Sequence, residues 1–161
     1  MESIIALLII FVSGILLNVG VNKYKEYKTK TSFLYSLKNA NIPIITIDNA
    51  GCPLNLLVDT GASKNILDTG ALAKVFSIKT DKKDTIVTGN GEISGDVYNI
   101  EFYLNDGTLV SGEFTVLETL SESFKETSRR LGIQVHGILG IPFLVNCNCI
   151  IDFNKLTIWR K

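Results

Sequence analysis

The sequence contains few of the residues on which metal sites and disulfide scaffolds depend. It has one histidine and three cysteines, namely Cys52, Cys147 and Cys149. Three cysteines are too few for a disulfide framework, and their odd number favours a reducing compartment. The pair Cys147-x-Cys149 is a weak metal signal beside a single histidine, and we interpret both as small, half-buried strand residues. We therefore expect no metal ion.

The chain also lacks an excess of positive charge. Its 16 Lys and Arg residues balance its 16 Asp and Glu residues. Residues 31–161 hold 12 of the former and 14 of the latter, which gives a net charge of −2. A nucleic-acid-binding domain normally shows a basic face or stripe. We therefore expect no nucleic-acid partner.

One segment lacks charge altogether. Residues 3–22 read SIIALLIIFVSGILLNVGVN, and a helix of that length, about 30 Å, matches the hydrocarbon core of a bilayer. We predict a transmembrane helix over residues 1–22. A cleaved signal peptide is the alternative, but the preceding MES carries no Lys or Arg and no A-x-A-like site follows the run.

A polar connector over residues 23–40 follows the apolar run. It begins with KYKEYKTK, which is rich in lysine, whereas the other flank of the run holds only Glu2. Positively charged flanks tend to remain on the cytoplasmic side of a membrane. We therefore expect a single-pass membrane protein whose C-terminal domain lies on the cytoplasmic side.

The remainder of the chain, residues 41–161, has the pattern of an all-β domain. Many short apolar runs are separated by turn signals such as Asn105-Asp106-Gly107, which favours a closed or sandwich-like β fold. We predict strands over residues 42–47, 54–58, 84–88, 93–104, 108–117, 149–153 and 156–160, and short helices over 119–132 and 141–146.

The tetrapeptide Asp-Thr-Gly-Ala occurs twice, at residues 59–62 and 68–71. Asp59 ends the apolar run LNLLV, where an acidic side chain is costly unless it has a use. Asp68 precedes the helix-forming run ALAK, and Asp is a preferred N-cap residue. We interpret Asp59 as a candidate site residue and Asp68 as a helix cap.

Four features, in order, resemble the retropepsin-like aspartic proteases. VDTGAS at residues 58–63 matches their active-site loop, and IVTGNGEISG at residues 86–95 falls where they carry a flap hairpin. ILG at residues 138–140 matches the element that packs behind that loop, and residues 141–153 resemble the short helix and strand that follow it. The resemblance covers nearly all of the chain beyond the connector. It implies an acid-protease fold, a closed β-barrel with one or two short helices.

The resemblance implies an aspartic endopeptidase that works as a homodimer. The chemistry needs two carboxylates about 3 Å apart that share one proton, so that one acts as acid while the other activates a water. The chain has one loop of this kind, so Asp59 of two copies would meet on a two-fold axis. Activity would be highest at acidic to mildly acidic pH, because it falls once both carboxylates ionise.

The resemblance also assigns roles to residues around Asp59. Thr60 would bond to its counterpart in the partner, and Gly61 would permit the tight turn. The residues implied to contact a peptide bound as an added strand are Ala62, Ser63 and the flap-tip residues Gly89, Asn90 and Gly91. Those implied to support the loop are Ile138, Leu139 and Gly140. This mechanism uses no metal ion and no organic cofactor.

Two features depart from the family pattern. Residues 118–135 are an extra segment that shorter members lack, and the flap tip reads Gly-Asn-Gly-Glu rather than a more apolar glycine-rich sequence.

The alternative function is a non-catalytic dimerisation or peptide-binding module with the same fold, tethered to a membrane. The intact Asp-Thr-Gly-Ala-Ser favours the protease, because a binding module has no reason to bury two carboxylates face to face. We interpret the single histidine, His136, as a surface or hydrogen-bonded residue without a catalytic role.

Overall fold

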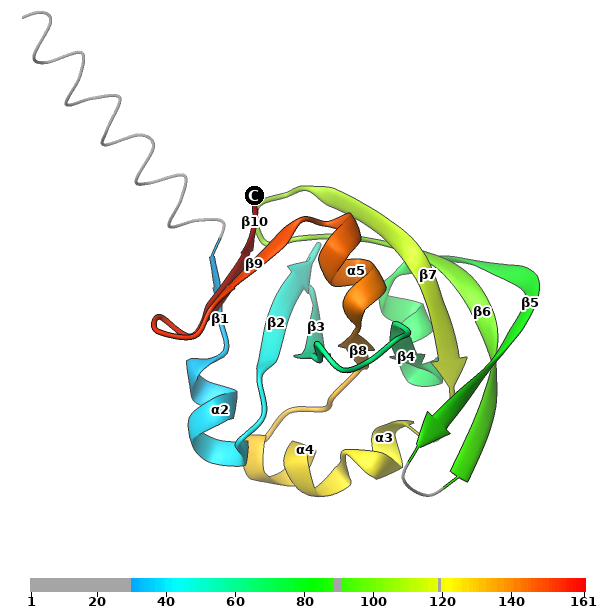
Figure 1. The fold of residues 1–161 in the computed structure, drawn as a ribbon, viewed down its shortest axis with the longest axis horizontal. Coiled ribbons are helices and arrows are strands. Elements are labelled where there is room, and N and C mark those ends of the chain that lie inside the picture. The colour runs from blue at the N-terminus through cyan, green and yellow to red at the C-terminus, as the bar shows by residue number, and fades with distance from the viewer. Residues whose placement is uncertain (1–29, 89–90, 119) are drawn as a thin grey trace, which may run out of the picture. The chain divides into compact units, whose positions relative to one another are not determined.

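Ten strands of the described residues form two separate sheets (Figure 1). This computed structural model describes residues 30–88, 91–118 and 120–161. The seven-stranded sheet has the order β2-β3-β8-β4-β7-β6-β5, and the three-stranded sheet has the order β1-β10-β9. The strands are β1 (Thr31–Ser32), β2 (Ile44–Asn49), β3 (Cys52–Val58), β4 (Ile66–Asp68), β5 (Phe76–Thr88), β6 (Gly91–Tyr103), β7 (Leu109–Leu117), β8 (Gly137–Leu139), β9 (Cys149–Asp152) and β10 (Thr157–Arg160).

Short helices connect and cover these strands. They are α2 (Leu34–Ala40), the 3-10 helix η1 (Thr69–Lys74), α3 (Leu120–Ser123), α4 (Lys125–Leu131) and α5 (Ile141–Asn146). None of the helices in the described part of the chain is long and apolar enough to cross a membrane. The segment predicted to do so, residues 1–22, lies outside the described residues.

β2 and β3 form a tight hairpin because their turn residues adopt positive φ. Asn49 pairs with Cys52, so only Ala50 and Gly51 connect the strands, with φ angles of 51° and 84°. A two-residue turn of this kind suits the right-handed twist of the paired strands. The hairpin fixes β3 within the sheet and so places Asp59 directly after the end of an inner strand.

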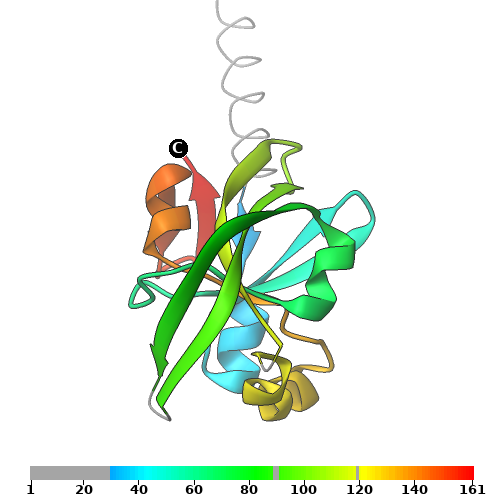
Figure 2. The same ribbon diagram turned by 90° about the vertical axis from the view of Figure 1, so that its right-hand side faces the viewer.

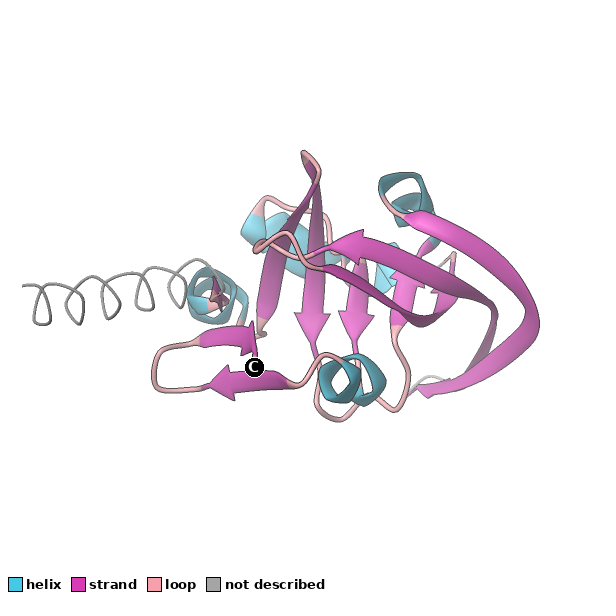
Figure 3. Ribbon diagram, turned by 90° about the horizontal axis from the view of Figure 1, so that it is seen from above, coloured by secondary structure: helices cyan, strands magenta, loops and turns pink. Residues whose placement is uncertain are grey.

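The seven-stranded sheet is open, and the predicted closed barrel is therefore wrong for the described residues. β2 and β5 end the sheet and do not pair with each other. Helix α5, seen beside the strands in Figure 3 and labelled in Figure 1, covers the core instead. Its Phe143 ring stacks on Phe102 with ring centroids 5.7 Å apart, and its centroid lies 6.5 Å from that of Phe114. Because a helix and aromatic side chains bury the apolar faces, no continuous strand ladder is needed.

The folded unit begins earlier than residue 41. Thr31–Lys161 form one compact unit, and β1 pairs with β10. Ser36 of α2 is 3% exposed, and its hydroxyl oxygen lies 2.8 Å from the nitrogen and 2.9 Å from the oxygen of Ile44. Residues 31–40, assigned to the connector because of their polarity, are thus hydrogen-bonded parts of the domain.

Two helices occupy the segment for which the sequence predicts one. α3 ends at Ser123 and α4 begins at Lys125. Between them, Phe124 packs against two apolar clusters. Gly132 follows α4 with φ 67° and caps it, so the predicted glycine stop is confirmed.

Candidate active site

The loop that begins at Asp59 lies between two strands of the large sheet. β8 pairs parallel with β3, with Val58 opposite Leu139, and antiparallel with β4. The N–H of Asp59 donates to the C=O of Leu139 at 3.0 Å. The loop connects β3 to β4, and β8 lies between these two strands in the sheet. The segment ILG therefore lies directly behind the loop.

The loop folds back on itself around the Asp59 carboxylate. Oδ1 of Asp59 accepts a hydrogen bond from the N–H of Gly61 at 2.8 Å. The C=O of Asp59 accepts a longer one, 3.3 Å, from the N–H of Ala62. Asp59 is half-buried, whereas Thr60 and Gly61 are exposed. The carboxylate thus has a fixed orientation and remains open to a ligand, a water or a second protein chain.

The backbone behind the loop is packed so closely that Gly140 cannot carry a side chain. A Cβ at this position would lie 2.3 Å from the C=O oxygen of Lys64 and 2.7 Å from that of Ala62. The N–H of Ile141 donates to the same Ala62 oxygen at 2.9 Å. The start of α5 therefore fixes the far side of the loop.

An apolar hollow of about 370 Å3 opens beside Asp59. Its walls are aromatic and aliphatic side chains from β3, from β9 and the residue after it, and from the segments just before α2 and β2, with Asp59 and Thr60 as its polar part. The lining residues are Phe33, Ile42, Pro43, Leu57, Val58, Asp59, Thr60, Ile151 and Phe153. Such a hollow fits an apolar side chain, either of a bound peptide or of a second copy of the protein.

The second Asp-Thr-Gly-Ala copy serves a local structural role. Asp68 is 5% exposed and is the N-cap of η1, where its side chain accepts from the N–H of Gly70 at 2.9 Å. The prediction that Asp68 caps a helix is confirmed, although the helix is a 3-10 helix. The structure thus separates the two aspartates into a surface loop and a buried cap.

His136 is hydrogen-bonded, which was one of the two interpretations of the sequence, but the other is wrong because the residue is buried and not at the surface. It is 4% exposed, and its Nδ1 accepts from the N–H of Asn55 at 2.9 Å. Burial lowers the pKa of His136 below its ordinary value, the positive charge of Lys74 lowers it further, and Asp68 opposes both. His136 does not line the hollow beside Asp59, so it has the role of a neutral structural acceptor.

The flap-like hairpin is formed by β5 and β6 and extends away from the rest of the sheet (Figure 2). Ile86 pairs with Ile93, and both pack against the apolar cluster of Ile66, Leu117 and Leu120. β6 pairs with β7 from Asp96 to its end at Tyr103. Between Asp96 and the tip of the hairpin, β6 pairs only with β5 among the described residues. Of the flap-tip residues, Gly91 begins β6, and Gly89 and Asn90 lie outside the described residues.

An ion pair links the loop to this hairpin. Lys64 Nζ lies 2.9 Å from Asp84 Oδ2, and the hydroxyl of Thr115 donates to the same oxygen at 3.2 Å. The Lys64 ammonium holds the pKa of Asp84 below its ordinary value. Because Lys64 belongs to the loop and Asp84 to β5, the base of the hairpin and the loop are coupled.

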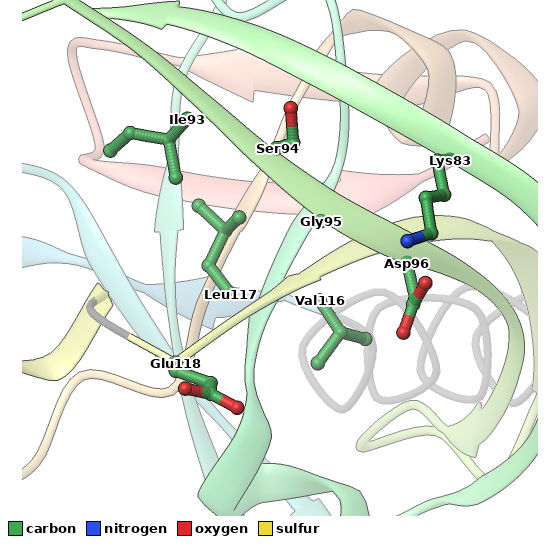
Figure 4. A pocket seen from close by; sticks show the side chains of 8 residues that line it. All are labelled: Lys83, Ile93, Ser94, Gly95, Asp96, Val116, Leu117 and Glu118. Carbon is green, nitrogen blue, oxygen red and sulfur yellow. The ribbon is translucent and has the colours of Figure 1, made fainter.

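A second hollow of about 310 Å3 lies where β6 departs from β7 (Figure 4). Ile93 and Leu117 form its apolar part, and charged side chains lie at its rim. Its lining residues are Lys83, Ile93, Ser94, Gly95, Asp96, Val116, Leu117 and Glu118. It contains none of the residues from Asp59 to Ser63, so it is separate from the candidate site.

The described residues hold no group of three or more His, Cys, Asp and Glu side chains that could bind a metal ion. Cys52 is exposed, Cys147 buried and Cys149 half-buried.

One residue near the site, Asn65, was missed by sequence reasoning. It is a buried polar residue, and the only signal for it was a polar side chain directly before the apolar pair Ile66-Leu67.

Comparison with known proteins gives one family match for the chain. A family model described as aspartyl protease matches residues 45–143, which is more than half of the chain. The matched range includes the Asp59 loop, the β5–β6 hairpin and β8. No curated protein matches the chain significantly.

Proposed function

This chain belongs to the aspartyl protease family, and on that premise we propose that it is a homodimeric aspartic endopeptidase. Asp59 of each copy forms the catalytic dyad. One carboxyl group, protonated, donates to the carbonyl oxygen of the scissile peptide bond, while the other, ionised, takes a proton from the attacking water. The β5–β6 hairpin closes over the bound peptide and excludes bulk water.

One observation carries this proposal. Of the two Asp-Thr-Gly-Ala copies, only the first presents its carboxylate on a surface loop beside an apolar hollow. The second is a buried helix cap. A single chain therefore offers one candidate carboxylate where the chemistry needs two, and a second copy supplies the other.

The region around the hollow supports a dimer interface. β9 is the outer strand of the three-stranded sheet, and an unpaired strand edge readily pairs with another chain. Three apolar side chains at or next to β9 and α5 are exposed: Phe153 is 69%, Val145 63% and Ile150 37% exposed. Phe153 also lines the hollow beside Asp59, so an interface here would bring a partner to the proposed dyad.

The test is cleavage of a mixed peptide library by the full-length chain, purified in mild detergent because of its apolar N-terminal run. Products are identified by mass spectrometry from acidic to neutral pH and over a range of protein concentrations. Asp59→Asn is the inactive variant, and Asp68→Asn is the matched control from the same tetrapeptide. We expect cleavage at acidic pH that rises more steeply than linearly with concentration, disappears in Asp59→Asn and persists in Asp68→Asn.

The alternative, a non-catalytic dimerisation or peptide-binding module, predicts a different outcome. A folded and dimeric wild-type protein that cleaves nothing at any pH would contradict the protease and support the module. Cleavage that survives in Asp59→Asn would contradict the dyad itself.

We also propose that residues 1–22 anchor the protein in a membrane with the protease domain on the cytoplasmic side. The support is the uncharged run over residues 3–22 and the lysine-rich flank that follows it. In cells, alkaline extraction should leave the full-length chain in the membrane pellet and release a chain that lacks residues 1–22. Release of both chains into the supernatant would contradict the anchor.

A further inference from the structure

Asn65 is a buried side chain whose polar groups all contact the backbone of other elements. It is 3% exposed. Its Oδ1 accepts hydrogen bonds from the N–H of Gly140 at 3.1 Å and of Phe143 at 3.2 Å, and its Nδ2 donates to the C=O of Glu113 at 3.0 Å. The C=O of Asn65 also accepts from the N–H of Thr115 at 2.9 Å. Asn65, at the end of the loop, is thus hydrogen-bonded to both the start of α5 and β7.

Asn65 supplies a helix cap that α5 lacks locally. The N-cap residue of α5 is Gly140, which has no side chain to accept a hydrogen bond. The first N–H groups of a helix have no partner within it. Here Ile141 donates to Ala62 and Phe143 donates to Asn65. The Asp59 loop therefore satisfies the first turn of α5, and the helix in turn holds the loop.

The loop is restrained on both sides by this arrangement. It cannot move toward β8, because the Gly140 Cα already lies so close to the C=O groups of Lys64 and Ala62 that a Cβ would overlap them. It cannot move away without breaking the hydrogen bonds of Asn65, which would leave buried N–H groups without a partner, and such groups are unfavourable. At its start, the N–H of Asp59 is bonded to Leu139.

We propose that Asn65 is a positioning residue of the active site, which holds the loop over residues 59–64 in the geometry that the Asp59 chemistry requires. The inference rests on the proposed protease function. Asn65 is buried behind the loop and acts on substrate only through Asp59. A displacement of about 1 Å in a catalytic group can lower the rate about a hundredfold, so the rigidity of this attachment determines the rate of the chemical step.

The experiment compares wild type, Asn65→Ala and Asn65→Asp as full-length proteins. Peptide cleavage gives kcat and KM separately, and NMR gives the hydrogen-exchange rates of the Gly61 and Ala62 amides. In Asn65→Ala, kcat should fall at least about tenfold with KM changed less than about threefold, since positioning affects the transition state more than substrate binding. Exchange at Gly61 and Ala62 should accelerate at least about tenfold as the loop is released.

The conservative variant keeps the acceptor that α5 needs. Asn65→Asp retains an oxygen that accepts from Gly140 and Phe143. At the acidic pH of the cleavage assay the new carboxyl group is protonated, because burial disfavours its charged form, so it places a hydroxyl group rather than a negative charge against the C=O of Glu113. Asn65→Asp should restore kcat to within about threefold of wild type, since the attachment to α5 is kept. Exchange at Gly61 should return toward the wild-type rate as well.

A matched control is provided by Asn55. It is 6% exposed, and its side chain accepts from Thr46 Oγ1 and donates to the C=O of Gln134, both at 2.8 Å. Neither partner belongs to the loop. Asn55→Ala should therefore lower the urea midpoint as Asn65→Ala does, but leave kcat and the exchange of Gly61 and Ala62 unchanged.

Every outcome decides the inference. Unchanged kcat and exchange in Asn65→Ala would overturn it, and so would an equal loss in Asn55→Ala, because the effect would then be one of general stability. If Asn65→Ala does not fold, Asn65→Ser takes its place with the same readouts. If the wild-type protein cleaves no peptide, the proposed function fails, and the exchange of Gly61 and Ala62 alone decides whether Asn65 holds the loop.

Discussion

Asp59 and Asp68 accept the same local hydrogen bond in two different environments. Oδ1 of Asp59 accepts from the N–H of Gly61 at 2.8 Å, and Oδ1 of Asp68 accepts from the N–H of Gly70 at 2.9 Å. Identical tetrapeptides therefore form the same side chain to backbone bond, although only the second copy begins a 3-10 helix. What differs is the surroundings, because Asp59 borders an apolar hollow whereas Asp68 is buried.

Alanine substitutions should have opposite effects at the two aspartates. Asp68→Ala removes a helix cap and should lower the free energy of unfolding by about 1 kcal/mol while kcat is unchanged. Asp59→Ala should abolish cleavage with a smaller loss of stability, because that side chain is partly exposed. Urea unfolding and peptide cleavage measure the two effects. Loss of activity in Asp68→Ala without loss of stability would reverse the assignment.

Local patterns predicted the elements that depend on short-range bonding. The hairpin that ends at Val58, the cap at Asp68 and the stop at Gly132 were all read from residues within a few positions of each other. Such features are predictable because their partners are close in sequence.

Features that depend on distant partners were not predictable in the same way. Ser36 looks like part of a polar connector until its bond to Ile44 is known, and the openness of the sheet depends on how α5 packs on β6 and β7. Asn65 is bonded to residues 75 and 78 positions away in sequence. No pattern within the loop indicates those contacts.

Gly140 should tolerate no side chain, whereas Gly112 should. A Cβ at Gly140 would lie 2.3 Å from a backbone oxygen of the loop, whereas the nearest atom to a Cβ at Gly112 is 3.7 Å away. Gly140→Ala should lower the free energy of unfolding by about 1–3 kcal/mol or more and reduce kcat, because the loop must shift. Gly112→Ala is the control and should change neither quantity appreciably. A fully active Gly140→Ala would contradict the close packing behind the loop.

The Lys64–Asp84 ion pair should affect catalysis more than stability. The two side chains are 46% and 29% exposed, and such pairs contribute about 0–1 kcal/mol. If the pair couples the loop to the hairpin, Lys64→Gln should lower kcat/KM by up to about fivefold, the equivalent of about 1 kcal/mol. Lys125→Gln, which breaks the exposed pair with Glu122 on the α3–α4 segment, is the control. An equal effect of both variants would show that only surface charge matters.

His136 should make the fold less stable as the pH falls below about 6.5. Its pKa in the folded protein lies below the ordinary value of 6.5, so in that window the unfolded chain binds a proton that the folded chain does not. Stability therefore rises with pH through this window and is complete above it. His136→Gln should flatten the pH dependence of the free energy of unfolding between about pH 5 and about pH 7, the range in which histidine titrates. An unchanged slope in urea unfolding would assign the dependence to other groups.

A charge at Phe153 should dissociate the proposed dimer, and a charge at Phe76 should not. Both side chains are exposed in the single chain, Phe153 by 69% and Phe76 by 61%, although the Phe153 ring also makes an edge-to-face contact with the buried Phe33 ring, with centroids 6.3 Å apart. Phe153 lines the hollow beside Asp59, whereas Phe76 begins β5 at the end of the other sheet. Phe153→Asp would place a carboxylate in a desolvated interface, which is unfavourable without a partner charge, and it adds negative charge close to the dyad.

Sedimentation equilibrium should therefore show a monomer for Phe153→Asp and a dimer for Phe76→Asp. The rate of cleavage should be proportional to the fraction of dimer, so that Phe153→Asp regains activity only at higher protein concentration. A Phe153→Asp protein that remains dimeric and active would place the interface elsewhere, and the open edge of β9 would then need another explanation.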